Sequence, residues 1–209
     1  MSAAAKRAGR IDTPQLIAVS KVQPDARIQD MLAAGQKIFG ENRVQEAQKR
    51  WGETFAHVRG DISLRLIGPL QTNKAVEAVK LFDVIETVDR EKLVKALLKA
   101  ADTVGRMPEF LVQVNTGEED QKSGVMPQDL DAFLTRLKSE YNQTPKGLMC
   151  IPPQGEAASP HFWLLKKMAD RHGFSTISMG MSGDFETAIA LGATHVRVGS
   201  ALFGARNYA

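Results

Sequence analysis

Cysteine is nearly absent from the 209-residue chain, which contains Cys150 alone. A single thiol cannot form an internal disulfide and cannot by itself build a cysteine-based metal site, so both classes of scaffold are excluded. The four histidines lack metal-ligand spacing to acidic or cysteine partners, and no nucleophile elbow, Walker loop or zinc motif appears, so we expect no metal. Catalysis by the Cys150 thiol stays open but has little support in the sequence.

Long hydrophobic runs are also missing, since no apolar stretch approaches the roughly 20 residues of a membrane-spanning helix. Residues 1–9 are rich in alanine and include two basic residues, but no apolar stretch of a signal peptide follows them. We therefore expect a cytoplasmic protein with no membrane partner. Aromatic residues make up only 6% of the chain, and the net charge of +3 comes from basic residues scattered among acidic ones, so we expect no nucleic-acid partner.

The chain alternates between short β-branched runs and segments of helical periodicity. In the helical segments apolar residues recur at three- and four-residue spacing, as at Leu93, Leu97, Ala100 and Val104 before Gly105. Eight runs are candidate strands: residues 16–22, 37–40, 64–70, 84–88, 109–115, 146–151, 176–181 and 194–198.

Several candidate strands are apolar on both faces, which is typical of parallel strands buried between a core and surrounding helices. Eight β/α units in a chain of this length predict the α/β fold class and a (β/α)8 barrel of the TIM type. An open doubly wound sheet is the alternative if one or two strands are wrong. We expect residues 1–209 to form a single domain, with residues 1–14 as a short N-terminal extension.

Polar residues that directly follow apolar strands are the candidate site, because barrels of this type carry their chemistry at the carboxyl ends of the strands. Lys21 shares strand phase with Ile17 and Val19, which would direct its amine into an apolar interior. Burial disfavours the ammonium form, lowers the pKa of a lysine and yields the neutral amine that attacks carbonyl groups. The alternative is a lysine that leaves the sheet for solvent, the commoner place for this residue type.

The loops after the last two strands have the composition of a phosphate site. Arg197 lies between two valines in a strand, where a guanidinium requires an anionic or hydrogen-bond-accepting partner. Gly199 and Ser200 follow it, and their amides and hydroxyl can approach a phosphate closely. Ser182 begins a helix after the preceding strand and exposes free N–H groups there. The alternatives are a simple N-cap for Ser182 and a tight turn for Gly199.

Asn42 lies just past the strand at residues 37–40, where it contacts a ligand or serves a turn or helix cap. Residues 71–74 open another helix, and we interpret them as a solvated first turn.

Six motifs in order resemble one family. They are Ala-Val-Ser-Lys at 18–21, Phe-Gly-Glu-Asn at 39–42 followed by Val-Gln-Glu at 44–46, Ile-Gly-Pro-Leu-Gln-Thr-Asn-Lys at 67–74, Gly-Leu-Met at 147–149, Ser-Met-Gly-Met-Ser at 178–182 and Val-Arg-Val-Gly at 196–199. Together they closely resemble the pyridoxal-phosphate homeostasis proteins, also described as the YggS/PROSC type. The resemblance extends over residues 16–206.

The resemblance implies a barrel similar to the N-terminal domain of alanine racemase, with pyridoxal 5'-phosphate held as a Schiff base on Lys21. It implies that Arg197 is the partner of the pyridine nitrogen and that Asn42 lies near the ring. The phosphate contacts implied are Gly199, Ser200 and Ser182. The implied role is binding, buffering and delivering the cofactor to acceptor apo-enzymes, without robust turnover, so we do not expect an enzyme.

The chain departs from the common pattern of these relatives at three places. Gln23 stands where many relatives have a second lysine, and Arg43 where many have an aromatic residue. Only residues 3–10 precede the first strand region, so the leading helix typical of the family is mostly missing. Lys122 matches a lysine in the loop after the fifth strand and is either a secondary aldehyde site or an exposed loop lysine.

The alternative function is a racemase-like enzyme that acts on amino acids with the same cofactor. Enzymes of that type add a second domain with a catalytic tyrosine, whereas this chain ends at Ala209 and its tyrosines, Tyr141 and Tyr208, lie in no matching motif. A phosphate-binding barrel enzyme without pyridoxal is a second alternative and would not need Lys21. We expect a monomer, with a weak dimer as the alternative.

Overall fold

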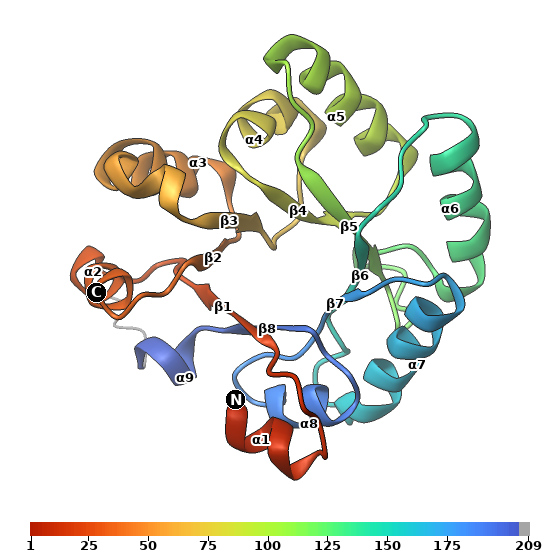
Figure 1. Cartoon of the computed structure of the whole chain (residues 1–209). Helices are drawn as coiled ribbons and strands as arrows, with labels where there is room; N and C mark the ends of the chain where they lie inside the picture. Colours follow the sequence, from red (N-terminus) through yellow and green to blue (C-terminus); the bar gives the residue numbers. More distant parts are fainter. Residues whose placement is uncertain (205–209) are drawn as a thin grey trace.

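The computed structural model describes residues 1–204; Tyr208 therefore lies outside the described residues. The strands, in chain order, are β1 (Gln15–Val19), β2 (Ile38–Glu41), β3 (Ser63–Leu66), β4 (Val84–Val88), β5 (Glu109–Val114), β6 (Gly147–Cys150), β7 (Thr176–Ser178) and β8 (His195–Val198). Each strand pairs in parallel with the next, and β8 pairs with β1, so that the sheet closes (Figure 1). The predicted (β/α)8 barrel is confirmed, and the open sheet is wrong.

Helices separate the strands and surround the barrel (Figure 1). The α-helices are α1 (Ser2–Arg7), α2 (Asp25–Ala33), α3 (Val44–Ala47), α4 (Ala75–Leu81), α5 (Glu91–Val104), α6 (Leu130–Ser139), α7 (Ala158–Arg171), α8 (Phe185–Ala190) and α9 (Ser200–Phe203). The remaining helices within residues 1–204 are of other types. They are the π-helix η1 (Gln48–Thr54) and the 3-10 helices η2 (Ala56–Asp61), η3 (Thr72–Lys74) and η4 (Pro127–Asp129). Helix α5 ends at Gly105, whose φ of 80° is the left-handed conformation that glycine adopts without steric cost.

All eight predicted strands are present, and most of their ends lie within one residue of the prediction, but three strands end well before it. Strands β1, β3 and β7 stop at Val19, Leu66 and Ser178, three or four residues before the predicted ends. The apolar residues beyond these ends, such as Ile67 and Met181, line a pocket instead of continuing the sheet. Apolar composition alone therefore extended the predicted strands into the loops that shape this pocket.

The two faces of the barrel wall differ in character. Outward-facing strand residues such as Phe39, Leu64 and Val196 are fully buried and belong to the large apolar cluster shared with the helices. On the inner face the apolar cluster is small and consists of Val84, Leu111 and Met149. Buried polar side chains such as Arg65, Glu86 and Arg197 share that interior with Ile17, in contrast to the apolar layers usual in such barrels.

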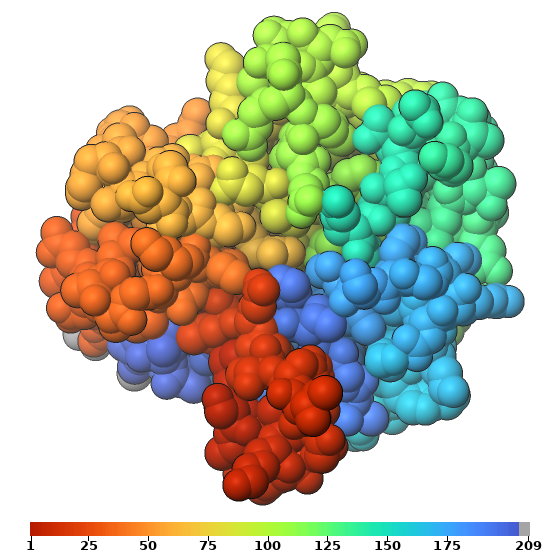
Figure 2. Space-filling view, in the orientation of Figure 1, coloured from red at the N-terminus to blue at the C-terminus, as the bar shows by residue number. Residues whose placement is uncertain are grey.

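The predicted N-terminal extension contains the short helix α1. Its Ala4 and Ala5 are buried, and the helix lies beside α8 at the edge of the barrel (Figures 1 and 2). Arg10 then joins the segment to the chain before β8 by donating to the carbonyls of Ile189 and Ala193, at 3.0 and 2.7 Å. The segment is thus packed against the barrel despite its brevity.

Candidate functional site

A pocket of about 250 Å³ lies at the carboxyl ends of the strands. Its polar lining consists of the six residues selected from the sequence: Lys21, Asn42, Ser182, Arg197, Gly199 and Ser200. Val19, Ile67, Ile151, Met181 and Gly183 form the rest of the lining. These residues come from the ends of strands that are far apart in the chain, and barrel closure brings them together.

The lysine of this pocket is placed differently from the prediction. Strand β1 ends at Val19, so Lys21 does not continue the strand phase. It lies in a turn in which the N–H of Gln23 donates to the carbonyl of Ser20 at 3.1 Å. Val22, which follows the lysine, has a φ of 59°, a conformation uncommon for any residue with a side chain. Lys21 is half-buried and reaches the pocket from this turn.

Arg197 is 3% exposed and begins a chain of polar contacts inside the barrel. Its Nη1 donates to Ser178 Oγ and its Nη2 to the carbonyl of Cys150, both at 2.8 Å. Ser178 Oγ donates in turn to Glu86 Oε2 at 2.6 Å, and Glu86 Oε1 forms an ion pair with Arg65 Nε at 2.5 Å. The requirement of a buried guanidinium for acceptors is therefore met by groups on other strands.

These linked polar contacts among Arg197, Ser178, Glu86 and Arg65 form what we call the interior chain. The interior chain carries a net positive charge, because its two arginines are accompanied by a single carboxylate, Glu86. His195 leaves this charge unchanged. Burial and the neighbouring Arg65 lower its pKa to about 4, so its imidazole is neutral at neutral pH. A buried excess of positive charge favours an anionic ligand at its accessible end. That end is Arg197, which lines the pocket.

Ser182 joins the loops after β7 and β8. Its hydroxyl accepts from the N–H groups of Gly199 and Ala201, both at 3.3 Å. The N-cap interpretation is wrong, because α8 begins later, at Phe185, with Asp184 in the N-cap position. The structure thus gathers a hydroxyl and the backbone amides at the start of α9 at one side of the pocket.

Asn42 faces the pocket without serving as a helix cap, since Arg43 occupies the N-cap position of α3. Its Oδ1 is buried and has no hydrogen-bond partner among residues 1–204. The loop after β3 can approach because Gly68 has no side chain, and a Cβ there would lie 2.3 Å from the carbonyl oxygen of Asn42. The pocket therefore offers an unfilled hydrogen-bonding position at this asparagine.

A second buried carboxylate, Glu41, was not among the residues selected from the sequence. Its Oε1 accepts from Ser20 Oγ at 2.6 Å, from Arg50 Nη1 at 3.0 Å and from Trp51 Nε1 at 3.1 Å. The signal that reveals it is strand phase, because Glu41 shares the face of Phe39, which packs on Trp51 with ring centroids 4.7 Å apart. A charged residue on the apolar face of a predicted strand requires buried partners.

Three other residues singled out in the sequence lie outside this pocket. Lys122 is half-exposed and pairs with Glu119. Gln23 is buried, and its Oε1 accepts from Arg27 Nη1 at 3.2 Å. Arg43 lines a neighbouring cavity of about 930 Å³ that shares only Asn42 with the pocket.

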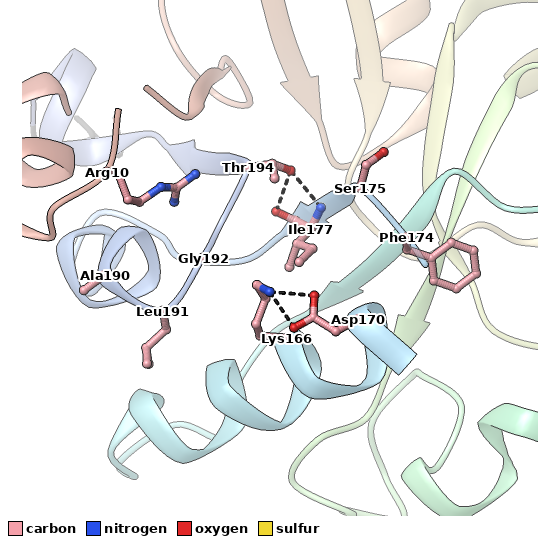
Figure 3. A pocket seen from close by; sticks show the side chains of 10 residues that line it. All are labelled: Arg10, Lys166, Asp170, Phe174, Ser175, Ile177, Ala190, Leu191, Gly192 and Thr194. Carbon is pink, nitrogen blue, oxygen red and sulfur yellow. Dashed lines mark hydrogen bonds and ion pairs between the residues drawn. The ribbon is translucent and has the colours of Figure 1, made fainter. Parts of the chain in front are cut away.

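The cysteine and the cleft at the opposite end of the barrel carry no comparable chemistry. Cys150 is fully buried, and burial raises the pKa of its thiol to about 12, which strongly disfavours the thiolate required of a nucleophile at neutral pH. A cleft of about 590 Å³ opens near the amino ends of β7 and β8, at the opposite end of the barrel. Figure 3 shows that Lys166 in this cleft is directed at Asp170, with their charged atoms 2.6 Å apart, so its cation is already paired.

Two further kinds of feature are absent from the part of the chain that the structure describes. No group of three or more histidine, cysteine, aspartate or glutamate side chains within residues 1–204 is arranged to hold a metal ion. No helix in the same part of the chain combines the length and apolar character that crossing a membrane requires.

Comparisons of the sequence with known proteins identify close relatives. The profile of the alanine racemase N-terminal domain family matches residues 2–207. A protein of Pseudomonas aeruginosa named pyridoxal phosphate homeostasis protein is 41% identical over 213 residues, which cover 98% of this chain and 90% of that protein. The Escherichia coli protein of the same name is 35% identical, over 100% of this chain and 93% of the relative.

The fold also resembles those of solved structures. PipY of Synechococcus elongatus, determined with PLP bound, superposes with a TM-score of 0.83 at 39% identity, covering 97% of this chain and 98% of PipY. Alanine racemase of Clostridium difficile superposes with a TM-score of 0.71 over 99% of this chain and 56% of the racemase. The identity to the racemase is only 14%, so that likeness shows the fold alone.

Proposed function

Because the chain belongs to the family of pyridoxal phosphate homeostasis proteins, we propose that it binds pyridoxal 5'-phosphate in the strand-end pocket and serves the homeostasis of that cofactor. One observation carries the proposal. An amine, a buried guanidinium and two small-residue loops converge on one cavity of about 250 Å³. A cavity of that size suits a compound with a single ring, since pockets for drug-sized ligands span about 300–1,000 Å³.

The residues present fit this ligand in charge and in hydrogen-bonding capacity. The interior chain ending at Arg197 has an excess positive charge, and pyridoxal phosphate is an anion. Asn42 Oδ1 is buried without a partner among residues 1–204 and marks a hydrogen bond left for a ligand. Ile151 and Met181 supply apolar surface, which suits the faces of a ring.

Each polar residue of the pocket has a role in the proposal. Lys21 holds the aldehyde carbon as a Schiff base, and Asn42 hydrogen-bonds beside the ring. The loop at Gly199 and Ser200 holds the phosphate together with the Ser182 hydroxyl, which the N–H groups of Gly199 and Ala201 position. When bound, the cofactor supplies an aldehyde that condenses with amines and a ring that withdraws electrons.

Arg197 gives the physical reason for proposing a carrier in place of a catalyst. Guanidinium is a donor only and stays protonated, so opposite the ring nitrogen it donates a hydrogen bond and leaves that nitrogen unprotonated. Its two Nη atoms are fixed by Ser178 and by the carbonyl of Cys150, which prevents the side chain from turning away. A ring in that state withdraws electrons weakly, which disfavours amino-acid racemisation.

The tyrosine within the described residues offers no substitute acid or base for the pocket. Tyr141 Oη donates to Glu91 Oε2 at 3.1 Å, and neither residue lines the pocket.

The proposed function also includes delivery. In this proposal a monomeric protein in the cytoplasm passes the cofactor to acceptor apo-enzymes.

The test of covalent attachment is reduction of the loaded protein with borohydride, followed by peptide mapping by mass spectrometry. We expect the adduct on Lys21, its loss in Lys21→Ala and its retention in the matched variant Lys122→Ala. An adduct confined to Lys122 would refute the assignment.

The test of the carrier role is incubation of the loaded protein with L-alanine in deuterated water, with Cα exchange followed by NMR. We expect negligible exchange. Exchange at enzyme-like rates of about 1 per second or more, lost in Lys21→Ala, would establish the racemase-like alternative.

A further inference from the structure

The turn that carries Lys21 adopts a costly backbone conformation. It spans Ser20 to Gln23, and the positive φ of 59° falls on Val22, its third residue. Turns with this pattern normally have glycine or asparagine there, because a β-branched side chain crowds the backbone in the left-handed region. The turn therefore persists only because its surroundings impose it.

Packing alone does not impose it, since the turn lies between two cavities. Lys21 lines the pocket of about 250 Å³ on one side. Val22 lines a separate cavity of about 370 Å³ on the other side, together with Asp25, Lys49 and Arg50. Val22 is 56% exposed, which is too much for apolar packing to hold its side chain in place. Hydrogen bonds at the two ends of the turn must supply the constraint.

Arg50 makes those bonds. Its Nη1 donates to the carbonyl of Ser20 and its Nη2 to the carbonyl of Gln23, each at 2.7 Å. One planar guanidinium thus joins the two ends of the turn through two separate nitrogens, and the single nitrogen of a lysine lacks this fork. Glu41, which is fully buried, fixes the guanidinium through its contact with Nη1 at 3.0 Å and also accepts from Ser20 Oγ.

We infer that Arg50, held by Glu41, is a positioning residue that directs the amine of Lys21 into the pocket. Arg50 does not line the pocket, so it acts on the cofactor only through the turn. The inference rests on the proposed function and adds to it the residue that sets the geometry of the covalent link. It predicts that substitution of Arg50 removes only the part of the binding affinity that Lys21 contributes, with the phosphate and ring contacts unchanged.

The experiment compares two ligands that differ only at the reacting group. Pyridoxal 5'-phosphate has the aldehyde, and pyridoxine 5'-phosphate has an alcohol that cannot bond to Lys21. Affinities of both are measured by calorimetry for the wild type, for Arg50→Gln and for Arg50→Lys. We expect the affinity for the aldehyde to fall at least tenfold in both variants, while that for the alcohol stays within about twofold.

Arg59→Gln is the matched control. Arg59 also donates to two backbone carbonyls, of Leu81 and Ile62, and pairs with Asp83 at 2.7 Å. Its side chain is 19% exposed against 14% for Arg50, but it joins the chain before β3 and β4, at the other end of the barrel. We expect this variant to bind both ligands as the wild type does.

The outcomes separate the inference from the function beneath it. A wild type that binds neither ligand, or binds both equally, contradicts the proposed function or its Schiff base. If the wild type binds the aldehyde more tightly than the alcohol, equal losses of affinity for both ligands in Arg50→Gln would show that Arg50 maintains the whole pocket. That result would overturn the inference. Unchanged binding, or full rescue by Arg50→Lys, would also overturn it. If Arg50→Gln does not fold, Arg50→Lys retains the cation and carries the comparison.

Discussion

The ion pair inside the barrel allows a sharp prediction about stability. Glu86 is fully buried, and the side chain of Arg65 is 7% exposed, so neither charge is solvated by bulk water. Glu86→Gln removes the carboxylate of the interior chain and leaves Arg65 and Arg197 as two uncompensated buried cations. Breaking a buried pair by removing one partner costs about 3–5 kcal/mol, and we expect this cost for Glu86→Gln.

Arg65→Met should cost somewhat less, because Glu86 then keeps the Ser178 hydrogen bond and the positive charge of Arg197 beyond it. The double variant removes both members of the pair and leaves a neutral amide for Ser178. Since no unpaired ion from the pair remains, we expect the double variant to be more stable than the sum of the single effects predicts, by at least about 2 kcal/mol.

The assay is urea unfolding of the four proteins at one pH, with the slopes compared to verify that the transition is unchanged. A Ser178→Ala variant, which breaks the chain of contacts without removing a charge, is the control and should cost about 1–3 kcal/mol. Additivity of the two single effects within about 0.5 kcal/mol would refute the reasoning, because independent sites behave in that way.

Three further predictions concern single residues. The pKa of His195 is about 4 in the folded chain, below the unfolded value of about 6.5, so its contribution to stability is present above pH 6.5 and is lost as the pH falls towards 4. Unfolding free energies should therefore decline over that range by up to about 3 kcal/mol in the wild type and less in His195→Gln; identical pH profiles would contradict this. Cys150 should resist a thiol reagent at pH 8 in the native protein and react once urea unfolds it, whereas rapid native labelling would disprove burial of the thiol. Pyridoxal without phosphate should bind far more weakly than the phosphate ester. Ser182→Ala should lower the affinity for the ester and leave that for pyridoxal unchanged; equal losses of affinity for both ligands would count against a phosphate contact.

Local pattern in the sequence determined the fold and the end of the barrel at which the site lies. Alternating strand and helix periodicities are properties of neighbouring residues, so they identify eight β/α units without knowledge of tertiary contacts. Parallel strands in a barrel all present their carboxyl ends at one face, and this rule by itself predicts that Lys21, Asn42 and Arg197 lie together. The strand ends were the weak point, because apolar residues after a strand look the same whether they extend the sheet or line a pocket.

Tertiary structure alone decided how the site residues are held. Ser178 and Glu86 are 92 residues apart in the chain, and their hydrogen bond exists only because closure of the barrel directs side chains of β4 and β7 into one interior. Arg50 and Ser20 are 30 residues apart, and their contact depends on where η1 packs against the barrel. Such contacts follow from the stagger of a closed sheet and the docking of helices on it, which no local periodicity encodes. Strand phase was therefore the wrong basis for placing Lys21, because β1 ends before it, although the predicted end of the barrel was correct.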